Sequence, residues 1–243
     1  WWPNQSIAND LRPTEPSGQT QHSYKMKHNF YIREQLSHAI EQRLGQYARG
    51  DLIDIGCGTK QYRTMVARYT DSHTGVDHSE TQHDKSNIDI LATAYDIPVD
   101  DNMYDTALCT EVLEHLESPE HAVRECFRVL KRGGYAIYTS PFIWHIHEAP
   151  RDFYRYSNYG LRHIFESAGF EIVAIDPLNG FVGTFGQLSV YFLNEYNGGI
   201  VRKVGIITAI GWAIQKSLPF LDRLLYRPRW TSHFITVVRK PSP

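Results

Sequence analysis

Apolar residues recur at helical spacing in the first quarter of the chain and in short runs after it. Four aliphatic side chains follow one another at intervals of four positions, at Ile32, Leu36, Ile40 and Leu44. This stripe predicts an amphipathic helix over residues 25–48, which Gly50 ends. Beyond it, short apolar runs alternate with helical stretches. Because parallel strands need crossover connections, the alternation predicts a parallel sheet with helices on both faces.

Seven strands are expected in this part of the chain, six of them before a long insert. Strands are predicted at 51–55, 73–77, 88–92, 104–110, 135–141, just after Gly169, and at 232–240. Helices are predicted at 61–69, 119–130 and before Gly169, with the paired glycines of "KRGG" as a helix cap. The expected fold class is α/β, a doubly wound, Rossmann-like, mostly parallel sheet with a helical insert before the last strand.

Changes in composition divide the chain into three parts. Residues 1–24 mix Pro, Gly, Ser and Gln without a period, which predicts a flexible arm. Residues 25–176 and 230–243 form the main domain. Residues 177–229 form the insert, whose most apolar run lies between Lys203 and Lys216 and is too short to span a membrane. We expect it to be a lid, a homodimer face or a peripheral membrane contact.

The overall composition excludes several classes of protein. The 243 residues carry a formal net charge of −2, with 42% hydrophobic and 21% charged residues, as in ordinary globular proteins. With this net charge the chain has no overall basic field, so the composition does not indicate a nucleic acid partner. The three cysteines form no CxxC pair, so neither zinc nor redox chemistry is indicated. We expect a cytoplasmic protein, although the chain lacks an initiating Met and its targeting stays open.

The run "DLIDIGCGTK" at 51–60 combines a strand with a glycine turn that suits a nucleoside cofactor. Gly56 and Gly58 allow a sharp turn and a close approach of a ligand to the backbone. A dinucleotide fingerprint would need glycine where Gln61 stands, which weakens the case for NAD. The carboxylate of Asp54 suits a ligand with an ammonium group, as in S-adenosylmethionine. Asp77, at the tip of the second strand, suits the ribose of either cofactor.

Five motifs in order carry a resemblance to a known family. They are "DIGCGT", "GVD", "ATAYDIPVDDNMYD", "CTEVLEHL" and "RVLKRGGYAIYTSP". Residues 50–175 resemble a class I S-adenosylmethionine-dependent methyltransferase of the small-molecule, type 11 group. Two positions depart from the family pattern. Lys60 replaces the last glycine of the first motif, where we expect its side chain to point outward, and Thr93 replaces an acid.

The resemblance implies S-adenosylmethionine as the cofactor and assigns residues to it. Asp54, Gly56 and Gly58, with Cys57 between the glycines, would line the methionine moiety. Asp77 and the adjacent His78 would hold the ribose. In the same way Thr93 and Ala94 would border the adenine, and Glu111 would face the methionine or sulfonium end.

The loop "WHIHEAPRDFYRYS" at 144–157 follows the fifth strand and is dense in titratable and aromatic side chains. Ligands of open α/β sheets bind beyond the carboxyl ends of the strands, so this loop is expected to border the substrate. The predicted substrate-binding residues are His145, Asp152, Tyr154, Arg155 and Tyr156. The loop also allows two other interpretations. One is a structural loop in which Asp152 pairs with Arg155. The other is a metal site at His145, His147 and Glu148, which the absence of an H-E-x-x-H motif disfavours.

The resemblance and this loop together predict methyl transfer to a small polar or sugar-bearing acceptor, at oxygen. A hydroxyl acceptor would need a base, and the candidates are His147, Glu148 and His115. One alternative is a non-catalytic scaffold that keeps the fold. Another is a methyltransferase for a lipid-linked acceptor at a membrane surface, because Lys and Arg residues flank the apolar insert. A nicotinamide oxidoreductase is disfavoured by Gln61.

Overall fold

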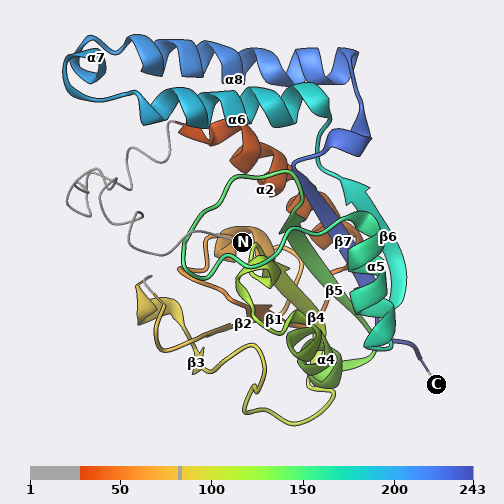
Figure 1. The fold of residues 1–243 in the computed structure, drawn as a ribbon. Helices are drawn as coiled ribbons and strands as arrows, with labels where there is room; N and C mark the ends of the chain where they lie inside the picture. The colour runs from red at the N-terminus through yellow and green to blue at the C-terminus, as the bar shows by residue number, and fades with distance from the viewer. Residues whose placement is uncertain (1–27, 82–83, 243) are drawn as a thin grey trace, which may run out of the picture.

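A seven-stranded sheet forms the centre of the protein (Figure 1), for which a computed structural model describes residues 28–81 and 84–242. The strand order is β3-β2-β1-β4-β5-β7-β6, with β7 antiparallel to both neighbours and every pairing among β1 to β5 parallel. The strands are β1 Asp51–Ile55, β2 Ser72–Asp77, β3 Ile90–Leu91, β4 Tyr104–Thr110, β5 Leu130–Pro141, β6 Glu171–Pro177 and β7 His233–Arg239. The mostly parallel sheet is thereby confirmed, whereas the predicted arm at 1–24 lies outside the described residues.

Helices cover both faces of the sheet and enclose two apolar cores. They are α2 Phe30–Tyr47, α3 Arg63–Val66, α4 Pro119–Val129 and α5 Asn158–Ser167. On one face Val123 of α4 and Phe165 of α5 are fully buried, and on the other Ile40 and Leu44 of α2 are fully buried. The spacing of four along α2 therefore buries the predicted stripe, since these positions lie on one side of a helix.

Two predicted helical boundaries were wrong, both because of local backbone geometry. The helix expected at 61–69 shortens to the four residues of α3, preceded by turns in which Lys60 has a φ of 54°. The "KRGG" run is not a helix cap, because β5 begins directly at Leu130 and contains it. At Gly134 a Cβ would lie 2.9 Å from the carbonyl oxygen of Asp105, so the strands approach too closely there for any side chain.

The insert before β7 is a helical hairpin that lies above the edge of the sheet (Figure 1). It consists of α6 Phe181–Glu195, α7 Gly199–Val204, α8 Ile206–Leu224 and the short η3 Pro228–Trp230. α6 and α8 run side by side, and a Cβ on Gly186 would lie 2.2 Å from the Cδ2 atom of Leu218. The glycine thus allows the two helices to pack closely.

One buried carboxylate joins the two ends of this hairpin. Asp222, near the end of α8 and 5% exposed, accepts hydrogen bonds of 2.8 Å from the backbone N–H groups of Gly180 and Gly183. These groups open α6 and have no partners within the helix. Asp222 therefore caps α6 from another helix, where a negative charge also suits the helix dipole.

Replacement of this cap should destabilise the protein. We expect Asp222→Ala to lower the free energy of unfolding by about 1–3 kcal/mol, because two buried N–H groups lose their acceptor. Urea unfolding followed by circular dichroism measures the change. Asp71→Ala, at an exposed position, is the matched control and should leave the midpoint unchanged. Equal midpoints for the two variants would contradict this role of Asp222.

Candidate functional site

The glycine turn after β1 is tightly folded against the segment that follows β4. Gly56 and Gly58 have φ angles of 73° and 50°, which side-chain-bearing residues seldom adopt. The N–H groups of Gly56 and Cys57 both donate to the carbonyl oxygen of Val76 in β2. A Cβ on Gly56 would lie 2.4 Å from Cγ2 of Val112. Packing against Val112 and the positive φ therefore require glycine at position 56, even without a ligand.

Asp77 stands at the carboxyl end of β2 with its carboxylate fixed by two backbone groups. Oδ2 accepts the N–H of Gly58 at 2.8 Å, and Oδ1 accepts the N–H of His78 at 2.7 Å. An ionised carboxylate has about four acceptor sites, so each oxygen retains capacity for another donor. The His78 side chain is more exposed, and its Nε2 lies 3.9 Å from Oδ1 of Asp77.

Asp54 and Lys60 are engaged inside the protein. Asp54 is 3% exposed, its Oδ2 lies 3.0 Å from Nε2 of His73, and burial raises the pKa of its carboxyl. The Lys60 side chain does not point outward, contrary to expectation. Its ammonium group pairs with Asp89 and donates to the carbonyl oxygen of His73. This path is open because a Cβ on Gly75 would lie 2.3 Å from Cε of Lys60.

The remaining predicted cofactor residues lie along the edge of β2 and β3. Thr93 is exposed and Ala94 is half-buried, in a tight turn that begins at Thr93 and pairs it with Asp96. Cys57 is buried in the glycine turn, and burial, with the nearby charge of Asp54, raises the pKa of its thiol to about 12. Cys57 is thus a packing residue there and not a thiolate at neutral pH.

A cleft of about 720 Å³ opens at the carboxyl ends of β4 and β5, beside α2. It brings together four predicted site residues, namely Glu111, His115, His147 and Glu148. Sequence analysis missed other residues that line it, including Arg33, Tyr62, Trp144, Tyr191 and His233. Trp144 lies in the loop already singled out, whereas His233 and Tyr191 come from β7 and the insert, which nothing in the sequence linked to this site.

Glu111 is held in an unusual conformation at the wall of the cleft. It follows β4 with a φ of 54°, a strained value for a residue with a side chain, and such strain concentrates at functional sites. Its Oε2 lies 3.0 Å from Nε2 of His233, while its Oε1 is buried without a hydrogen-bond partner among the described residues. Burial opposes ionisation, but the charge and hydrogen bond of His233, together with a hydrogen bond from Thr139, outweigh it and lower the pKa of Glu111.

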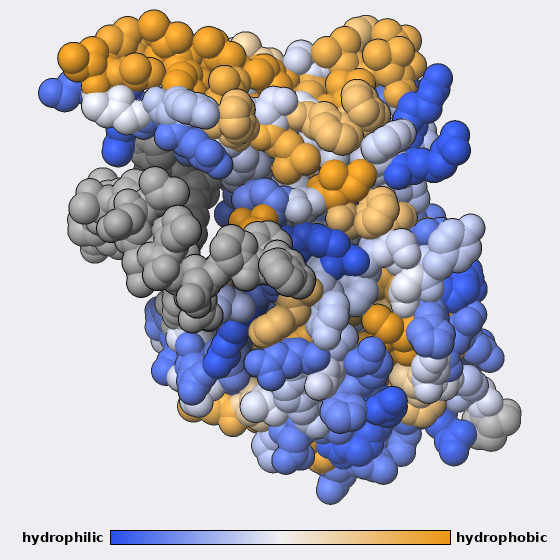
Figure 2. All heavy atoms as spheres, viewed as in Figure 1, coloured by the Kyte–Doolittle hydropathy of each residue, from blue (hydrophilic) through white to orange (hydrophobic). Residues whose placement is uncertain are grey.

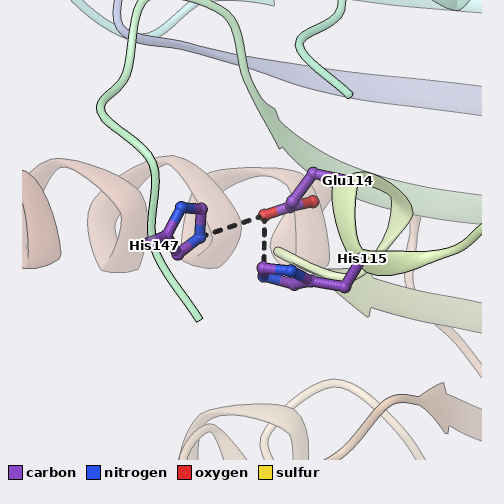
Figure 3. A group of neighbouring side chains, drawn as sticks. All are labelled: Glu114, His115 and His147. Atoms are coloured by element: carbon purple, nitrogen blue, oxygen red, sulfur yellow. Dashed lines mark ion pairs between the residues drawn. The ribbon is translucent and has the colours of Figure 1, made fainter. Parts of the chain in front are cut away.

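Glu114, His115 and His147 point toward one another from two segments (Figure 3). An oxygen of Glu114 lies 3.7 Å from Nε2 of His115 and 3.9 Å from Nε2 of His147. Glu114 is fully buried, and neither oxygen has a hydrogen-bond partner among the described residues. Burial and the charge of Glu111 raise the pKa of Glu114 well above its usual range. Burial in this position therefore favours the protonated form of the carboxyl group.

The same three side chains have the composition of a divalent-metal site. Their ligand atoms lie within 4.8 Å of one another, and one carboxylate with two imidazoles is a ligand set that zinc accepts. Among the residues described, these are the ones placed to hold a metal ion. The metal site disfavoured on sequence grounds drew on the 144–157 loop, and Glu114 belongs to a different motif, "CTEVLEHL".

The protonation of His115 is fixed by its neighbour. Its Nδ1 lies at hydrogen-bond distance from the carbonyl oxygen of Arg151, which only accepts, so Nδ1 must carry the proton. In the neutral ring Nε2 then holds the lone pair, 3.8 Å from Oε2 of Glu148. The His147 ring stands edge-on to it at 4.8 Å, and burial together with His115 lowers the pKa of His147. The lowered pKa favours a neutral imidazole at His147, on the wall of the cleft.

The loop after β5 is held by an internal ion pair. Arg155 donates to both carboxylate oxygens of Asp152, at 2.6 and 2.7 Å, and Asp152 also accepts the N–H of His147. The pairing holds the pKa of Asp152 near 2. Tyr156 is buried with its hydroxyl on the carbonyl oxygen of Leu113, and the Tyr154 hydroxyl reaches that of Glu117.

These contacts favour the structural interpretation for most of the predicted substrate residues. Asp152, Tyr154, Arg155 and Tyr156 hold the loop in place and do not line the cleft. His145 stacks on Tyr191 with ring centroids 4.5 Å apart, which ties the loop to α6. The residues of this loop that reach the cleft are Trp144, His147 and Glu148.

Comparison with known proteins finds a family match over the part of the chain that contains the glycine turn and β4. Residues 53–138 match the family model described as a methyltransferase domain. The ubiquinone biosynthesis O-methyltransferases of Shewanella pealeana and Nitrosomonas europaea are 27% and 28% identical over 112 and 115 residues. Each alignment covers 42% of this chain and 48% of the relative, so the chain spans about half the length of the curated relatives it matches.

Solved structures share the fold at low sequence identity. The [4+2]-cyclase SpnF is 24% identical with a TM-score of 0.58, over 86% of this chain and 81% of its own. A SAM-dependent methyltransferase from Archaeoglobus fulgidus is 17% identical with a TM-score of 0.57, over 89% and 99% of the two chains. The predicted fold is confirmed, and the cyclase shows that this fold also occurs in a protein named for a different reaction.

The raised pKa of Glu114 predicts a pH-dependent stability. Above the unfolded pKa of about 4.3, only the folded state keeps the proton, so stability falls by about 1.4 kcal/mol per pH unit until the folded pKa is reached. Glu114→Gln keeps the shape of the side chain but has no ionisable carboxyl group. Urea unfolding at pH 5 and pH 8 should therefore show a smaller fall in the free energy of unfolding for this variant than for the wild type. The exposed Glu117→Gln should behave like the wild type. A slope unchanged by Glu114→Gln would show that Glu114 ionises in the folded protein.

Proposed function

We propose that this chain, which contains a class I S-adenosylmethionine-dependent methyltransferase domain, transfers a methyl group to an oxygen of a polar acceptor bound in the cleft. The observation that carries the proposal is the position of Glu111. Its strained backbone, and a buried oxygen without a hydrogen-bond partner in the part of the chain that the structure describes, support a role as an acceptor at the carboxyl end of β4, beside the glycine turn of the matched domain. Such an atom suits the ammonium group of S-adenosylmethionine.

The residues at the ends of β1 and β2 fit the rest of this cofactor. Gly56 and Gly58 would allow the ligand to approach the backbone, and Asp77 keeps acceptor capacity for ribose hydroxyls after binding two N–H groups. Asp54 is buried and supports the glycine turn through its contact with His73. This role does not require contact with the ligand. When bound, S-adenosylmethionine would supply a methyl group already activated by a sulfonium.

The protein's share of the chemistry is then alignment and removal of one proton. His115 is the base we propose, because its Nε2 lone pair is fixed by the bond from Nδ1 to Arg151. The imidazolium formed on taking the acceptor's hydroxyl proton is stabilised by Glu148, whose carboxylate lies 3.8 Å away. His147 is the second candidate. Oxygen as the acceptor atom is supported by the names of the two O-methyltransferase relatives.

The Asp152–Arg155 pair has a positioning role in this proposal. It fixes the backbone of His147 through one hydrogen bond and the carbonyl of His145 through another. Proximity and orientation account for much of the acceleration of a displacement, so movement of this loop would lower turnover without contact with the cofactor. The small polar or sugar-bearing acceptor expected from the sequence remains part of the proposal.

Cofactor binding can be tested without knowledge of the acceptor. Calorimetric titration with S-adenosylhomocysteine should show binding, whereas NAD should show none. Asp77→Asn should weaken the affinity about tenfold or more, because a charge-assisted bond is lost. Asp96→Asn, an exposed turn residue, is the control and should bind as the wild type does. A folded protein that binds NAD and not S-adenosylhomocysteine would overturn the proposal.

Turnover separates the base from the cofactor residues. With a pool of hydroxylated acceptors, release of S-adenosylhomocysteine should fall by about 10²- to 10⁴-fold in His115→Ala, while S-adenosylhomocysteine binding is retained. His163→Ala, an exposed histidine of α5, is the control. If His147→Ala alone produces the loss, the base is His147. If the wild type binds the cofactor but never releases product, the scaffold alternative is favoured.

A further inference from the structure

The helical insert exposes an unusually large apolar surface. Two thirds of the large apolar side chains that are exposed among the described residues lie within residues 181–230. Figure 2 shows this surface gathered along α7 and α8, while the body below them is mostly hydrophilic. The most exposed of these side chains are Ile200, Phe220, Leu224, Val204 and Tyr196, each above 60%. Apolar patches of this kind mark sites of contact with a partner or a membrane.

The apolar face of α8 points away from the protein, whereas the buried face is mixed. Leu218 is buried against α6, on the side of the helix that also carries Gly211, Gln215 and Asp222. The opposite side presents Ile206, Ile210, Phe220 and Leu224 to the outside. These positions recur at intervals that keep them on one face of a helix. A surface helix normally directs polar residues outward, so this outer face lacks the water-facing side of an ordinary amphipathic helix.

The charges around this face are mostly positive. Residues 177–230 contain six basic residues, Arg202, Lys203, Lys216, Arg223, Arg227 and Arg229, and two acidic residues, Glu195 and Asp222. Asp222 is buried as the cap of α6, so Glu195 is the acidic side chain of this segment that lies at the surface. The whole chain has a net charge of −2, so the positive charge is local to the insert.

We propose that the outer face of α7 and α8 binds the surface of a lipid bilayer that contains anionic headgroups. An apolar face flanked by Lys and Arg is the pattern of helices that lie in the membrane interface, where apolar side chains enter the acyl region and cations meet the headgroups. None of the described helices is long and apolar enough to cross a membrane. Contact therefore occurs along the face of the hairpin, and it does not depend on the proposed methyl transfer.

The position of the hairpin would bring the cleft to the bilayer. Tyr191 of α6 lines the cleft and makes a tilted ring contact with His145 and an edge-on contact with Trp144, both in the loop after β5. α8 also packs on α2, where the Lys216 ammonium lies 5.1 Å from the ring centroid of Phe30. The proposed membrane face thus lies on a helix, α8, that packs against the two helices that line the cleft, α6 and α2. An acceptor held in the bilayer would meet the cleft at its α2 and α6 wall.

Vesicle sedimentation tests this proposal with the full chain. Vesicles of phosphatidylcholine with 30% phosphatidylglycerol (a composition of about one anionic lipid in three) should carry the protein into the pellet, and phosphatidylcholine alone should carry much less. The triple variant Lys203→Gln, Arg223→Gln, Arg229→Gln should partition about a hundredfold less, from roughly a factor of five for each cation. Added salt should weaken binding of the wild type.

The apolar contribution needs its own variant and control. Ile200→Ser, Phe220→Ser and Leu224→Ser together should reduce binding by at least about tenfold, because each removes a side chain that would enter the acyl region. Tyr159→Ser, which changes an equally exposed side chain on α5, should bind as the wild type does. Circular dichroism and S-adenosylhomocysteine binding show that each variant is folded.

Two results would overturn the proposal. One is a folded wild type that stays in the supernatant with anionic vesicles. The other is a dimer in sedimentation equilibrium that the Ile200, Phe220 and Leu224 variant dissociates while vesicle binding is absent, because the face would then bind a second copy of the chain. Loss of S-adenosylhomocysteine binding without loss of vesicle binding would sink only the proposed function.

Discussion

The geometry of the cleft depends on the ion pair between Asp152 and Arg155. Arg155 donates to both oxygens of Asp152 and also to the carbonyl groups of Tyr154 and His145. The loop has no regular secondary structure of its own, so its backbone groups need partners of this kind. Because Asp152 also accepts the His147 N–H, the pair sets the distance from that imidazole to Glu114. Pairing makes the burial of both charges tolerable.

A second constraint reaches the cleft from the other end of the chain. His233 is the first residue of β7 and lies fully within the protein, where it contacts Glu111 at the end of β4. This contact exists because β7 runs antiparallel beside β5, so that its start meets the carboxyl ends of the parallel strands. The edge of the sheet that borders the cleft is therefore built from the ends of the parallel strands and the start of the antiparallel strand β7.

The sequence predicted the sheet well because strand signals are local. β1 and β4 lie at their predicted positions, since each is a short apolar run bounded by turn residues. The signal for the turn at Gly56 and Gly58 is also local. Three roles could not be predicted, because each depends on residues that are distant in the chain. Lys60 is buried through Asp89 and Gly75. Glu114 meets His147 only in the folded chain, and His233 in the same way meets Glu111. The position of a strand follows from nearby residues, whereas the burial of a side chain is decided by tertiary packing.

Pairing of β6 with β7 makes the whole insert, topologically, the loop of a β-hairpin. Pro177 pairs with Phe234, so the chain leaves and re-enters the sheet at neighbouring positions. Loop closure costs little more as a loop lengthens, and a hairpin loop can be exchanged without changing the strands that carry it. Evolution could thus lengthen, shorten or replace this segment while the turn at Gly56 and Asp77 stays intact. The insert is therefore modular with respect to the strand ends that carry Gly56 and Asp77.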